Sequence, residues 1–438
     1  MKSHLIIKLH QPAATTDHIP HWVDAISTKS GGSRQLVPAI DAILAGKSIP
    51  VWVTREYPVA GQDWSTAEIK HGLNRIYRLV LQDDRQLPAT LIRDINLLPE
   101  VNYARMGDIA VADLPQAHAL TDSQASINSG TDRASREAIR LPEAHLSSQG
   151  DRRVIVAVLD TGVDVDHAEL VHAYLPGKDF VDIIDGAERF LGDFLGYDND
   201  PDDTLVGHGT HVAGIIAAAG THMPRGVAPQ CRILPVRVLG AMKRGDKPVG
   251  AGLVDNINVG LKWAIDQGAE VVNMSLGVRD IGGGLPYKEV IDYARTKNVT
   301  IVAASGNNGS EDLYYPGAYP YVVTVGALDQ DKEHVAPFST YGKQVDLVAP
   351  GTDVYSTFLN NGYAFSSGTS HAAPFVSGAI ALLKSFARAK GHKLSDGRVK
   401  YIIKHTSDKV GSRYKHPKAG YGRLNIGDAM RLLRQKLN

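Results

Sequence analysis

The sequence contains a single cysteine, no excess of either charge and no long apolar run. Cys231 alone cannot form a disulfide within the chain, so a disulfide framework is excluded. Lysine and arginine number 47 and aspartate and glutamate number 47, so the zero net charge gives no support to a nucleic-acid or membrane-surface partner. No apolar segment is long enough to cross a membrane, and residues 1–10 lack the apolar stretch of a secretory signal. These absences predict a cytoplasmic location, or an extracellular one if a signal has been removed.

With 438 residues, the chain exceeds a single typical core and predicts two domains joined by a linker. Residues 1–113 carry the pattern of a small α+β domain. Its expected elements are a strand at 4–9, a helical or mixed segment at 66–83, a helix at 91–98 and a strand at 100–104. Residues 114–137 are rich in Ser, Asn, Asp and Gly with few large apolar residues, which predicts an exposed linker.

Residues 138–438 alternate continuous apolar runs with helical segments, which predicts an α/β domain with a mainly parallel sheet covered on both faces. The expected strands are 153–159, 232–238, 270–275, 299–304 and 321–326. The expected helices are 138–150, 208–219, 253–267, 286–297, 369–389 and 425–436. Sites in such sheets gather at the carboxyl ends of the strands, where Asp160, Asn273, Ser275 and Asn307 lie.

The stretch 366–374, SSGTSHAAP, runs directly into an apolar, small-residue segment that is typical of a buried helix. Gly368 suits a tight turn, and Thr369 and Ser370 are residue types that begin helices. Ser370 therefore lies where unpaired backbone N–H groups and the positive end of the helix dipole converge. Negative charge that forms on an attacked carbonyl is stabilised at such a place. An ordinary capped core helix is the alternative interpretation.

Two further stretches favour catalysis, namely 154–163 (VIVAVLDTGV) and 207–214 (GHGTHVAG). A serine hydroxyl needs a base to take its proton, and an imidazole suits that role near neutral pH. Asp160, His208 and Ser370, in that order, each at an element end and flanked by glycine, resemble the subtilisin-like serine peptidases, or subtilases. The resemblance covers about residues 138–430 and implies a three-layer αβα fold.

The resemblance implies a serine endopeptidase that hydrolyses internal peptide bonds through an acyl-enzyme. It makes Ser370 the nucleophile, His208 the base and Asp160 the group that orients the imidazole, while His211 is structural. By the same pattern, Asn307 donates to the oxyanion beside the Ser370 backbone N–H.

An extended substrate is expected to lie between two segments as an added strand. These segments are Gly250–Ala251–Gly252 and Ser275–Leu276–Gly277. The second wall of the pocket for the residue before the cleaved bond (P1) would include Ala304 and Gly306, with Tyr314 at its base. Relatives usually carry a small residue there, so Tyr314 is expected to shrink or polarise that pocket.

The close of the N-terminal domain, LPEVNYARMGDIAVADLP, is similar to the end of subtilase propeptides. This similarity implies that residues 1–113 inhibit the peptidase and assist its folding, so that the enzyme is made as a self-inhibited zymogen. The alternative is an unrelated accessory domain. If the enzyme processes itself, cleavage is expected within 114–137.

Four aspartates just before the histidine motif are similar to a calcium loop of some subtilases, and no organic cofactor is expected. They are Asp198, Asp200, Asp202 and Asp203. Closely spaced carboxylates repel unless a hard cation or water screens them, and calcium prefers roughly six to eight oxygens. An acidic, solvated loop is the alternative.

Three readings compete with an active serine peptidase. One is a zinc hydrolase that uses His208 and His211, and another is a locked or non-catalytic binding protein on a peptidase scaffold. A thiol nucleophile at Cys231 is the third, although a core position before the strand at 232–238 is expected. His371, where methionine is common in relatives, is expected to gain charge near pH ~6.5, the reference value for histidine, and to lower activity in acid.

Overall fold

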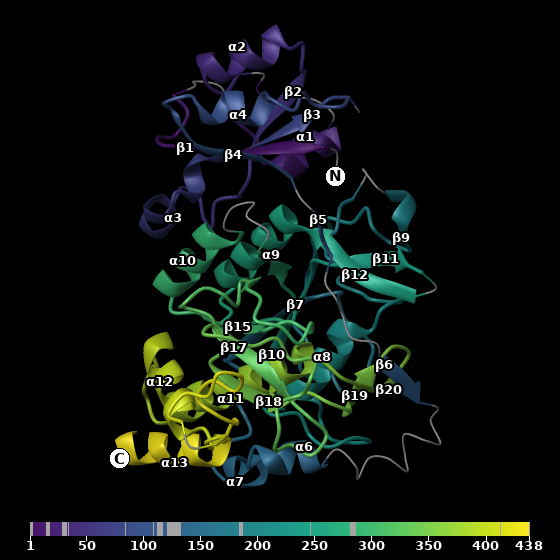
Figure 1. Ribbon diagram of the computed structural model, residues 1–438, viewed down its shortest axis with the longest axis vertical. Helices are drawn as coiled ribbons and strands as arrows, with labels where there is room; N and C mark the ends of the chain where they lie inside the picture. Colours follow the sequence, from purple (N-terminus) through teal and green to yellow (C-terminus); the bar gives the residue numbers. More distant parts are fainter. Residues whose placement is uncertain are drawn as a thin grey trace.

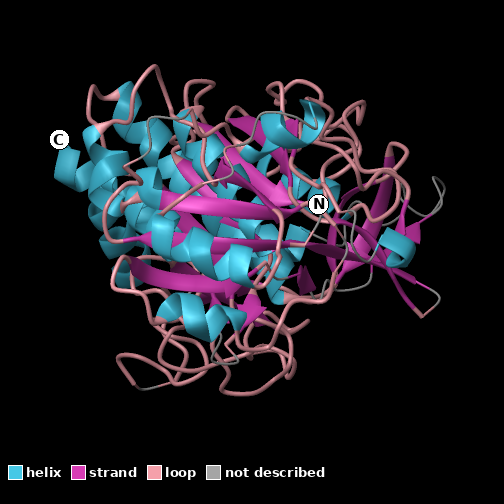
Figure 2. Cartoon of the chain, turned by 90° about the horizontal axis from the view of Figure 1, so that it is seen from above, coloured by secondary structure: helices cyan, strands magenta, loops and turns pink. Residues whose placement is uncertain are grey.

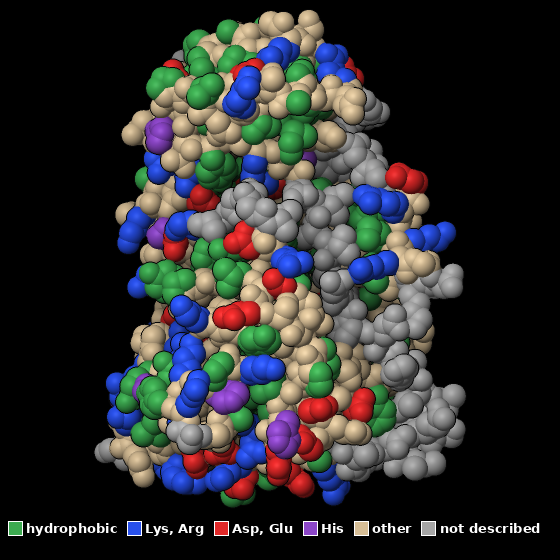
Figure 3. All heavy atoms as spheres, viewed as in Figure 1, with side chains coloured by type: hydrophobic (Ala, Val, Ile, Leu, Met, Phe, Trp, Pro, Cys, Tyr) green, Lys and Arg blue, Asp and Glu red, His purple; other side chains and the backbone are tan. Residues whose placement is uncertain are grey.

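A computed structural model describes residues 3–14, 18–28, 33, 35–83, 85–107, 109–111, 117–120, 133–183, 187–245, 247–280, 286–411 and 413–437. The small N-terminal domain, purple to blue in Figure 1, lies on top of the larger domain, and the C-terminal helices lie at the opposite end. Among the described residues, no helix is both long enough and apolar enough to span a membrane. On the face seen in Figure 3, acidic and basic side chains are interspersed.

The N-terminal domain is built on a four-stranded antiparallel sheet in the order β2-β3-β1-β4. Its strands are β1 (His4–Leu9), β2 (Val51–Arg55), β3 (Ile76–Leu81) and β4 (Val101–Met106). Its helices are α1 (Trp22–Thr28), α2 (Pro38–Gly46), α3 (Thr66–His71), η1 (Leu73–Arg75) and α4 (Leu91–Asn96). Ile40 of α2 and Ile95 of α4 pack on one face of the sheet, whereas Ile6 and Ile76 join the core of the larger domain.

The segment 66–83, expected to be helical or mixed, contains a helix and a strand. Ser65 and Glu68 form a capping box at the start of α3, which stabilises the helix where its first N–H groups lack partners. Gly72 ends it in the left-handed conformation with φ of 73°, a backbone geometry that glycine adopts at low cost. The chain then enters β3, all of whose residues are buried.

The larger domain is organised around a seven-stranded parallel sheet in the order β18-β17-β15-β13-β7-β10-β8. Its strands are β7 (Ile155–Asp160), β8 (Lys178–Asp179), β10 (Arg232–Arg237), β13 (Val271–Met274), β15 (Thr300–Ala304), β17 (Val323–Leu328) and β18 (Leu347–Pro350). Figure 2 shows strands running side by side with helices on both sides of them. The predicted αβα architecture is confirmed.

The side chains of β7 point alternately to the two faces of the sheet, which explains why the strand is apolar at every position before Asp160. Val156 and Val158 face the core formed with α8 (His208–Ala217) and α11 (Thr369–Ala389). Ala157 and Leu159 face the core formed with α9 (Val254–Asp266) and α10 (Lys288–Thr296). Because successive side chains of a strand point to opposite faces, a strand covered on both faces must be apolar at every position. Asp160 ends this run, and it is fully buried.

The remaining elements decorate the sheet. The strands are β5 (Ile109–Val111), β6 (Ala117–Leu120), β9 (Phe190–Leu191), β11 (Gly240–Arg244), β12 (Lys247–Leu253), β14 (Val278–Arg279), β16 (Tyr314–Tyr315), β19 (Val354–Phe358) and β20 (Gly362–Ser366). The helices are α6 (Arg133–Ala138), α7 (Leu141–His145), η2 (Ala187–Arg189), α12 (Asp396–Thr406) and α13 (Ile426–Leu437). Within the predicted linker 114–137, residues 117–120 pair as a strand and α6 begins at Arg133.

The single helix expected over 138–150 is wrong. The structure has two short helices, because Arg140 adopts the left-handed conformation with φ of 56° and Pro142 stands in the first turn of α7. A proline there lacks a donor that the first turn does not need, so it starts a helix and does not continue one.

Candidate active site

Asp160 and His208 form a buried pair at the carboxyl end of β7. His208 Nδ1 lies 2.6 Å from Asp160 Oδ1, which also accepts a hydrogen bond of 2.8 Å from the Thr161 N–H. His208 is only 4% exposed. A Cβ on Gly209 would stand 2.0 Å from the Gly162 carbonyl oxygen, so the close approach of α8 to the end of β7 requires glycine there. Asp160 thus fixes the imidazole at Nδ1, and Nε2 at the other edge of the ring is left to bind a second group.

Ser370 is the second residue of α11 and is 3% exposed. Its hydroxyl donates a hydrogen bond of 3.1 Å to the Ser275 carbonyl oxygen. In the described part of the chain, His208 Nε2 and Asp160 Oδ2 have no hydrogen-bond partner. The ring of His371, the residue after Ser370, lies 5.2 Å from the His208 ring between centroids, so the start of α11 lies close to the start of α8.

A chain of polar side chains under Ser370 fixes its backbone. Ser377 Oγ donates to Asn273 Oδ1 at 2.8 Å, and Asn273 Nδ2 donates to Ser275 Oγ at 2.9 Å. Ser275 Oγ in turn donates to the Ser370 carbonyl oxygen at 2.7 Å. All of these groups are buried, so each bond also removes the cost of an unsatisfied polar atom. Sequence reasoning missed Ser377, which lies two turns along an apolar helix and carries no local signal of this role.

Asn307 lies beside the start of α11. Its carboxamide oxygen accepts hydrogen bonds from the Thr369 N–H at 2.8 Å and the Thr369 hydroxyl at 2.9 Å. These two bonds orient the amide by its oxygen, so that its nitrogen is the donor end. Thr369 itself was not singled out from the sequence beyond its role as a helix-starting residue.

The comparison with family models matches residues 151–422 to the Subtilase family. The chain belongs to this family.

Relatives and solved structures agree with that assignment. The thermophilic serine proteinase of Bacillus sp. (strain AK1) is 40% identical over 277 residues, which cover 63% of this chain and 61% of that protein. Subtilisin Savinase of Lederbergia lenta is 36% identical, and the match covers 67% of this chain and 96% of the relative. Proteases from Pseudoalteromonas arctica superpose with a TM-score of 0.57 at 30% identity, covering 67% of this chain and 94% of theirs. The predicted family and its enzyme class, subtilisin-like serine endopeptidases, are confirmed.

Of the two predicted substrate segments of this subtilase, the first is already paired with other strands. Ala251 and Gly252 of β12 pair with Val111 and Ala110 of β5, a strand at the end of the N-terminal domain. Gly250 pairs on the other side, with Ala241 of β11. Ser275–Leu276–Gly277 follows β13, and Leu276 is buried. The structure thus brings an extended segment onto the predicted docking strand.

Tyr314 lies between the two predicted walls of the P1 pocket. A Cβ on Gly306 would stand 2.8 Å from Cδ2 and Cε2 of the Tyr314 ring. A Cβ on Gly277 would stand 3.4 Å from Tyr314 Cβ and 3.5 Å from Cδ1. The ring therefore fills space between the two glycines, and Ala304, at the end of β15, is buried beside them.

One aspartate of the predicted calcium loop, Asp203, is hydrogen-bonded by the protein's own groups. Asp203 is 4% exposed, and its carboxylate accepts from the N–H groups of Leu205, Val206 and Gly207 at 2.7–3.0 Å. It also accepts a hydrogen bond from the Thr161 hydroxyl. Asp203 is therefore a positioning residue for the turn before His208, which the spacing of carboxylates alone did not reveal.

The other three aspartates do not complete a metal site with it. Asp198 and Asp200 are exposed and accept hydrogen bonds from the N–H groups two residues on, in the geometry of Asx turns. Arg237 lines the same cavity of about 210 Å³ as Asp200 and Asp202, and its guanidinium pairs with the buried carboxylate of Asp179. Within the described ranges, no group of three or more His, Cys, Asp or Glu side chains is placed to hold a metal ion. Calcium binding by this loop stays a prediction.

His211 has the structural role expected of it, whereas His371 differs from its expectation. His211 Nε2 lies 3.1 Å from the Val354 carbonyl oxygen and 3.2 Å from that of Ala364, so it serves the fold and not a zinc ion shared with His208. Burial, with the charge of His208, lowers the pKa of His211 to about 3. Burial likewise lowers the pKa of His371 well below 6.5, so the expectation that His371 gains charge near pH ~6.5 is wrong.

Cys231 is buried, and its Sγ lies 3.5 Å from Ser385 Oγ. Burial raises the pKa of its thiol to about 11. A thiol of this kind is uncharged near neutral pH and inert as a nucleophile, so the structure supports the expected core role.

Proposed function

We propose that the chain is a serine endopeptidase that cleaves internal peptide bonds through an acyl-enzyme, with Asp160, His208 and Ser370 as its triad. The observation that carries this proposal is the buried 2.6 Å contact between Asp160 and His208 Nδ1; the ring of His371, the residue after Ser370, lies 5.2 Å from the His208 ring between centroids. That contact selects the tautomer in which Nε2 is an acceptor, because Nδ1 must carry the proton that Asp160 accepts.

In the first chemical step we expect the Ser370 hydroxyl to rotate. It turns from the Ser275 carbonyl to His208 Nε2, which takes its proton as the oxygen attacks the substrate carbonyl. Asp160 then stabilises the imidazolium, and His208 returns the proton to the leaving amine. Water repeats the sequence on the acyl-enzyme, with His208 again as the base.

The oxyanion that forms in each step is expected to lie between the Ser370 backbone N–H and Asn307 Nδ2. Ser370 is the second residue of α11, so its N–H is one of the four that a helix start leaves without an intrahelical partner. Asn307 is held by two hydrogen bonds from Thr369 before any substrate arrives. Donors fixed in advance pay no reorganisation cost when charge develops, which is why they accelerate the reaction.

We also propose that residues 1–113 keep the enzyme latent. His4 Nε2 lies 2.9 Å from Asp255 Oδ2, Arg78 Nη1 donates to Asn256 Oδ1 at 2.9 Å, and Lys262 Nζ lies 2.8 Å from Glu68 Oε1. Each contact joins the N-terminal domain to α9, and each lies in a buried interface. The β5 strand at the end of this domain pairs with β12, where the substrate is expected to bind. A segment in that place competes directly with substrate.

A locked, non-catalytic protein on the same scaffold is the second candidate, and it shares the same blocked strand. Hydrolysis of a peptide by the full-length chain separates the two, before and after a second protease cuts a recognition sequence inserted within 121–132. Activity that rises after the cut and is absent in Ser370→Ala supports a zymogen. A chain that remains inactive after the cut, in the parent as in Ser370→Ala, supports the locked protein.

For location we propose the cytoplasm. A relative named Major intracellular serine protease, from Bacillus subtilis (strain 168), is 37% identical over 60% of this chain. A single, buried cysteine suits a reducing compartment as well as an oxidising one. Fractionation of the native host with an antibody to the chain tests this directly.

A further inference from the structure

The C-terminal part of the larger domain carries a local excess of positive charge that the zero net charge of the whole chain hides. Residues 400–423, KYIIKHTSDKVGSRYKHPKAGYGR, contain seven lysine or arginine residues and one acidic residue. The stretch begins within α12 and ends before α13, at the end of the molecule opposite to the N-terminal domain (Figure 1). A basic cluster of this kind attracts polyanions.

Four aromatic rings lie side by side in this stretch. The rings of Tyr401 and His405 lie 4.2 Å apart between centroids, and the Tyr414 ring lies 6.3 Å from His405. The Tyr421 ring lies 5.6 Å from Tyr414 and 6.0 Å from His405. Tyr401 is 49% exposed and Tyr414 is 61% exposed, so two of the four rings are open to a partner.

Lysine side chains pack over these rings. Lys409 Nζ lies 4.7 Å from the centre of the Tyr414 ring and 5.6 Å from that of Tyr421, and Lys415 Nζ lies 5.6 Å from the centre of the Tyr421 ring. Lys409 donates hydrogen bonds to the carbonyl oxygens of Tyr414 and Tyr421, and Lys415 donates to that of Lys343. A carbonyl oxygen accepts a hydrogen bond but carries no charge, so these contacts do not cancel the positive charge of the ammonium groups.

The rings and lysines together form an aromatic–lysine face. It consists of Tyr401, His405, Tyr414, Tyr421, Lys409, Lys415 and Lys418. The acidic groups beside it are engaged with other cations, because Asp346 pairs with Lys404 at 2.7 Å and Asp408 pairs with Arg423 at 3.1 Å. Among the described residues, no carboxylate pairs with the three lysines of the face, so their charge is available to an outside anion.

We infer that the aromatic–lysine face binds single-stranded nucleic acid, with bases stacked on the exposed tyrosine rings and phosphates beside the lysines. Stacking on aromatic rings and ionic contacts to the backbone together hold single strands without selecting a sequence. A duplex keeps its bases stacked on one another, so only the lysines can contact it. This inference goes beyond the proposed peptidase activity and does not rest on it.

The side chains of the face favour this partner over an anionic membrane. Segments that lie on membranes combine basic residues with tryptophan, phenylalanine or leucine side chains that enter the acyl region. Between residues 400 and 423, the exposed large apolar side chains that the structure describes are those of Tyr401 and Tyr414. An acidic polypeptide would pair with the lysines but would leave these rings without a flat partner.

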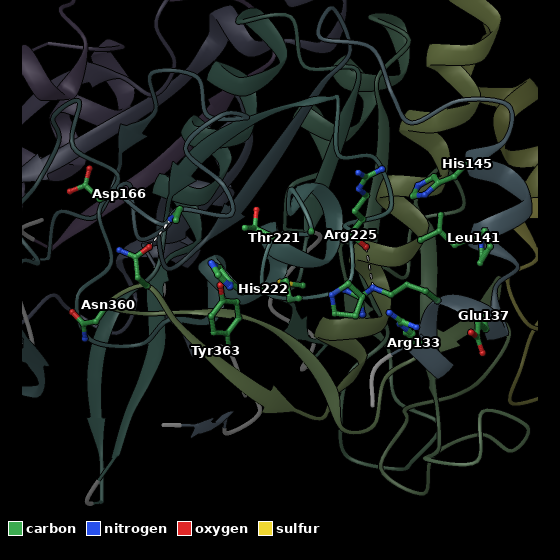
Figure 4. A pocket seen from close by; sticks show the side chains of 17 residues that line it. Arg133, Glu137, Leu141, His145, Asp166, Thr221, His222, Arg225, Asn360 and Tyr363 are labelled. Atoms are coloured by element: carbon green, nitrogen blue, oxygen red, sulfur yellow. Dashed lines mark hydrogen bonds between the residues drawn. The ribbon is translucent and has the colours of Figure 1, made fainter. Parts of the chain in front are cut away.

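A groove of about 1210 Å³ on other elements supplies a matched control (Figure 4). Arg133 and Arg225 line it, but Glu137 and Asp166 line it too, so its charges are of both signs. Arg133 and Arg225 are exposed, as are Lys415 and Lys418 of the aromatic–lysine face. Replacing either pair by alanine therefore removes the same charge from the chain, and only one of the pairs belongs to the face.

The test measures fluorescence anisotropy of a labelled oligothymidylate with the full-length chain, in a Ser370→Ala background that prevents self-digestion. Binding should weaken steeply as salt rises from about 50 to 200 mM. Lys415→Ala with Lys418→Ala should lower the affinity at the lower salt by about tenfold. It should also make the slope of log K against log salt shallower by about 1.4, since each phosphate contact on a single strand contributes about 0.7. Arg133→Ala with Arg225→Ala should change neither value.

The ring is tested separately from the charge. Tyr414→Leu should lower the affinity for the oligothymidylate by about tenfold, whereas Tyr414→Phe should keep it, because the ring and not the hydroxyl stacks on a base. The parent should bind a duplex of the same length more weakly than the single strand. Urea unfolding of each variant checks that the fold is retained.

Three outcomes would overturn the inference. The first is no binding at the lower salt, or an equal loss in the lysine and arginine double variants. The second is an equal affinity for duplex and single strand with no effect of Tyr414→Leu, since that pattern indicates charge without stacking. The third is binding to phosphatidylserine vesicles or to polyglutamate in place of the oligothymidylate, which would assign the face to a membrane or to an acidic polypeptide. Peptide hydrolysis by the cut chain is independent of all three, so the proposed function stands or fails by its own test.

Discussion

The Thr161 hydroxyl donates a hydrogen bond of 2.5 Å to Asp203 Oδ2 and so joins the residue after Asp160 to the loop before His208. The same threonine oxygen accepts from the Gly209 N–H at 3.1 Å. Two loops from distant parts of the sequence are thereby held together behind the acid and the base of the proposed triad. Their relative position depends on one buried carboxylate.

Asp203→Asn is expected to weaken this arrangement. The variant loses a charged acceptor of four hydrogen bonds, which should lower the free energy of unfolding by about 2 kcal/mol. A displaced imidazole should lower kcat by about tenfold or more. Urea unfolding and peptide hydrolysis measure the two effects, and Asp200→Asn, at an exposed turn, is the matched control with little change in either. If added calcium restores the free energy of unfolding and the kcat of Asp203→Asn, these aspartates act instead through a metal.

Asn307→Ala tests the proposed oxyanion donor. Loss of one such donor typically lowers kcat by on the order of 10²–10³-fold with little change in KM, because the bond is made only in the transition state. Thr369→Val keeps Asn307 but removes one of the bonds that orient it, so its kcat should fall less, by about tenfold. Steady-state kinetics on one peptide compare the three proteins. Equal kcat in the parent and Asn307→Ala would exclude the role.

Tyr314 should make the enzyme prefer small residues before the cleaved bond. The ring fills the space between Gly277 and Gly306, so a P1 phenylalanine has no room unless the ring moves. Tyr314→Gly is expected to raise kcat/KM for a P1-phenylalanine peptide by about 10- to 100-fold relative to the P1-alanine peptide. Tyr315→Phe, at the next position, keeps the P1 preference of the parent. A parent enzyme that already prefers phenylalanine would contradict this account of the pocket.

The buried histidines make the fold sensitive to acid. Below pH ~6.5 the unfolded chain binds a proton at His371 that the folded chain does not, so stability falls as pH falls. His371→Met removes this proton uptake. The free energy of unfolding of the variant, relative to that of the parent, should therefore rise by about 1.4 kcal/mol for each pH unit below that point. Urea unfolding at pH 7.5, 6.0 and 5.0, in a Ser370→Ala background that prevents self-digestion, measures the difference. A difference that does not change with pH would show that His371 is protonated in the fold.

Several elements could be predicted from the sequence because their cause is local. The helix expected at 369–389 has those bounds in the structure, since its small apolar residues leave no polar face. The strands before Asp160 and Asn307 are covered on both faces of the sheet. A strand of this kind is apolar at nearly every position, so the continuous apolar runs in the sequence predicted it. Asp160 and His208 were found from glycine-flanked motifs that resemble those of the subtilases.

The rest depends on tertiary contacts that no local pattern encodes. β6 is a four-residue strand within a polar stretch, and it exists only in its pairing with β20. Spaced aspartates look alike in a calcium loop and in a run of Asx turns, so the role of Asp203 required its partners to be known. The pKa of His371 depends on burial by distant elements, which its neighbours in sequence do not show.

The central claim is that Ser370 is a nucleophile activated by His208, and labelling with a fluorophosphonate tests it most directly. Intact-mass measurement of the chain cut within 121–132 should show one added label, mapped by peptide sequencing to Ser370 and unchanged by a chelator. The label should be lost in Ser370→Ala and strongly slowed in His208→Ala. An unlabelled Ser370, or labelling that proceeds as fast in His208→Ala, would contradict the account.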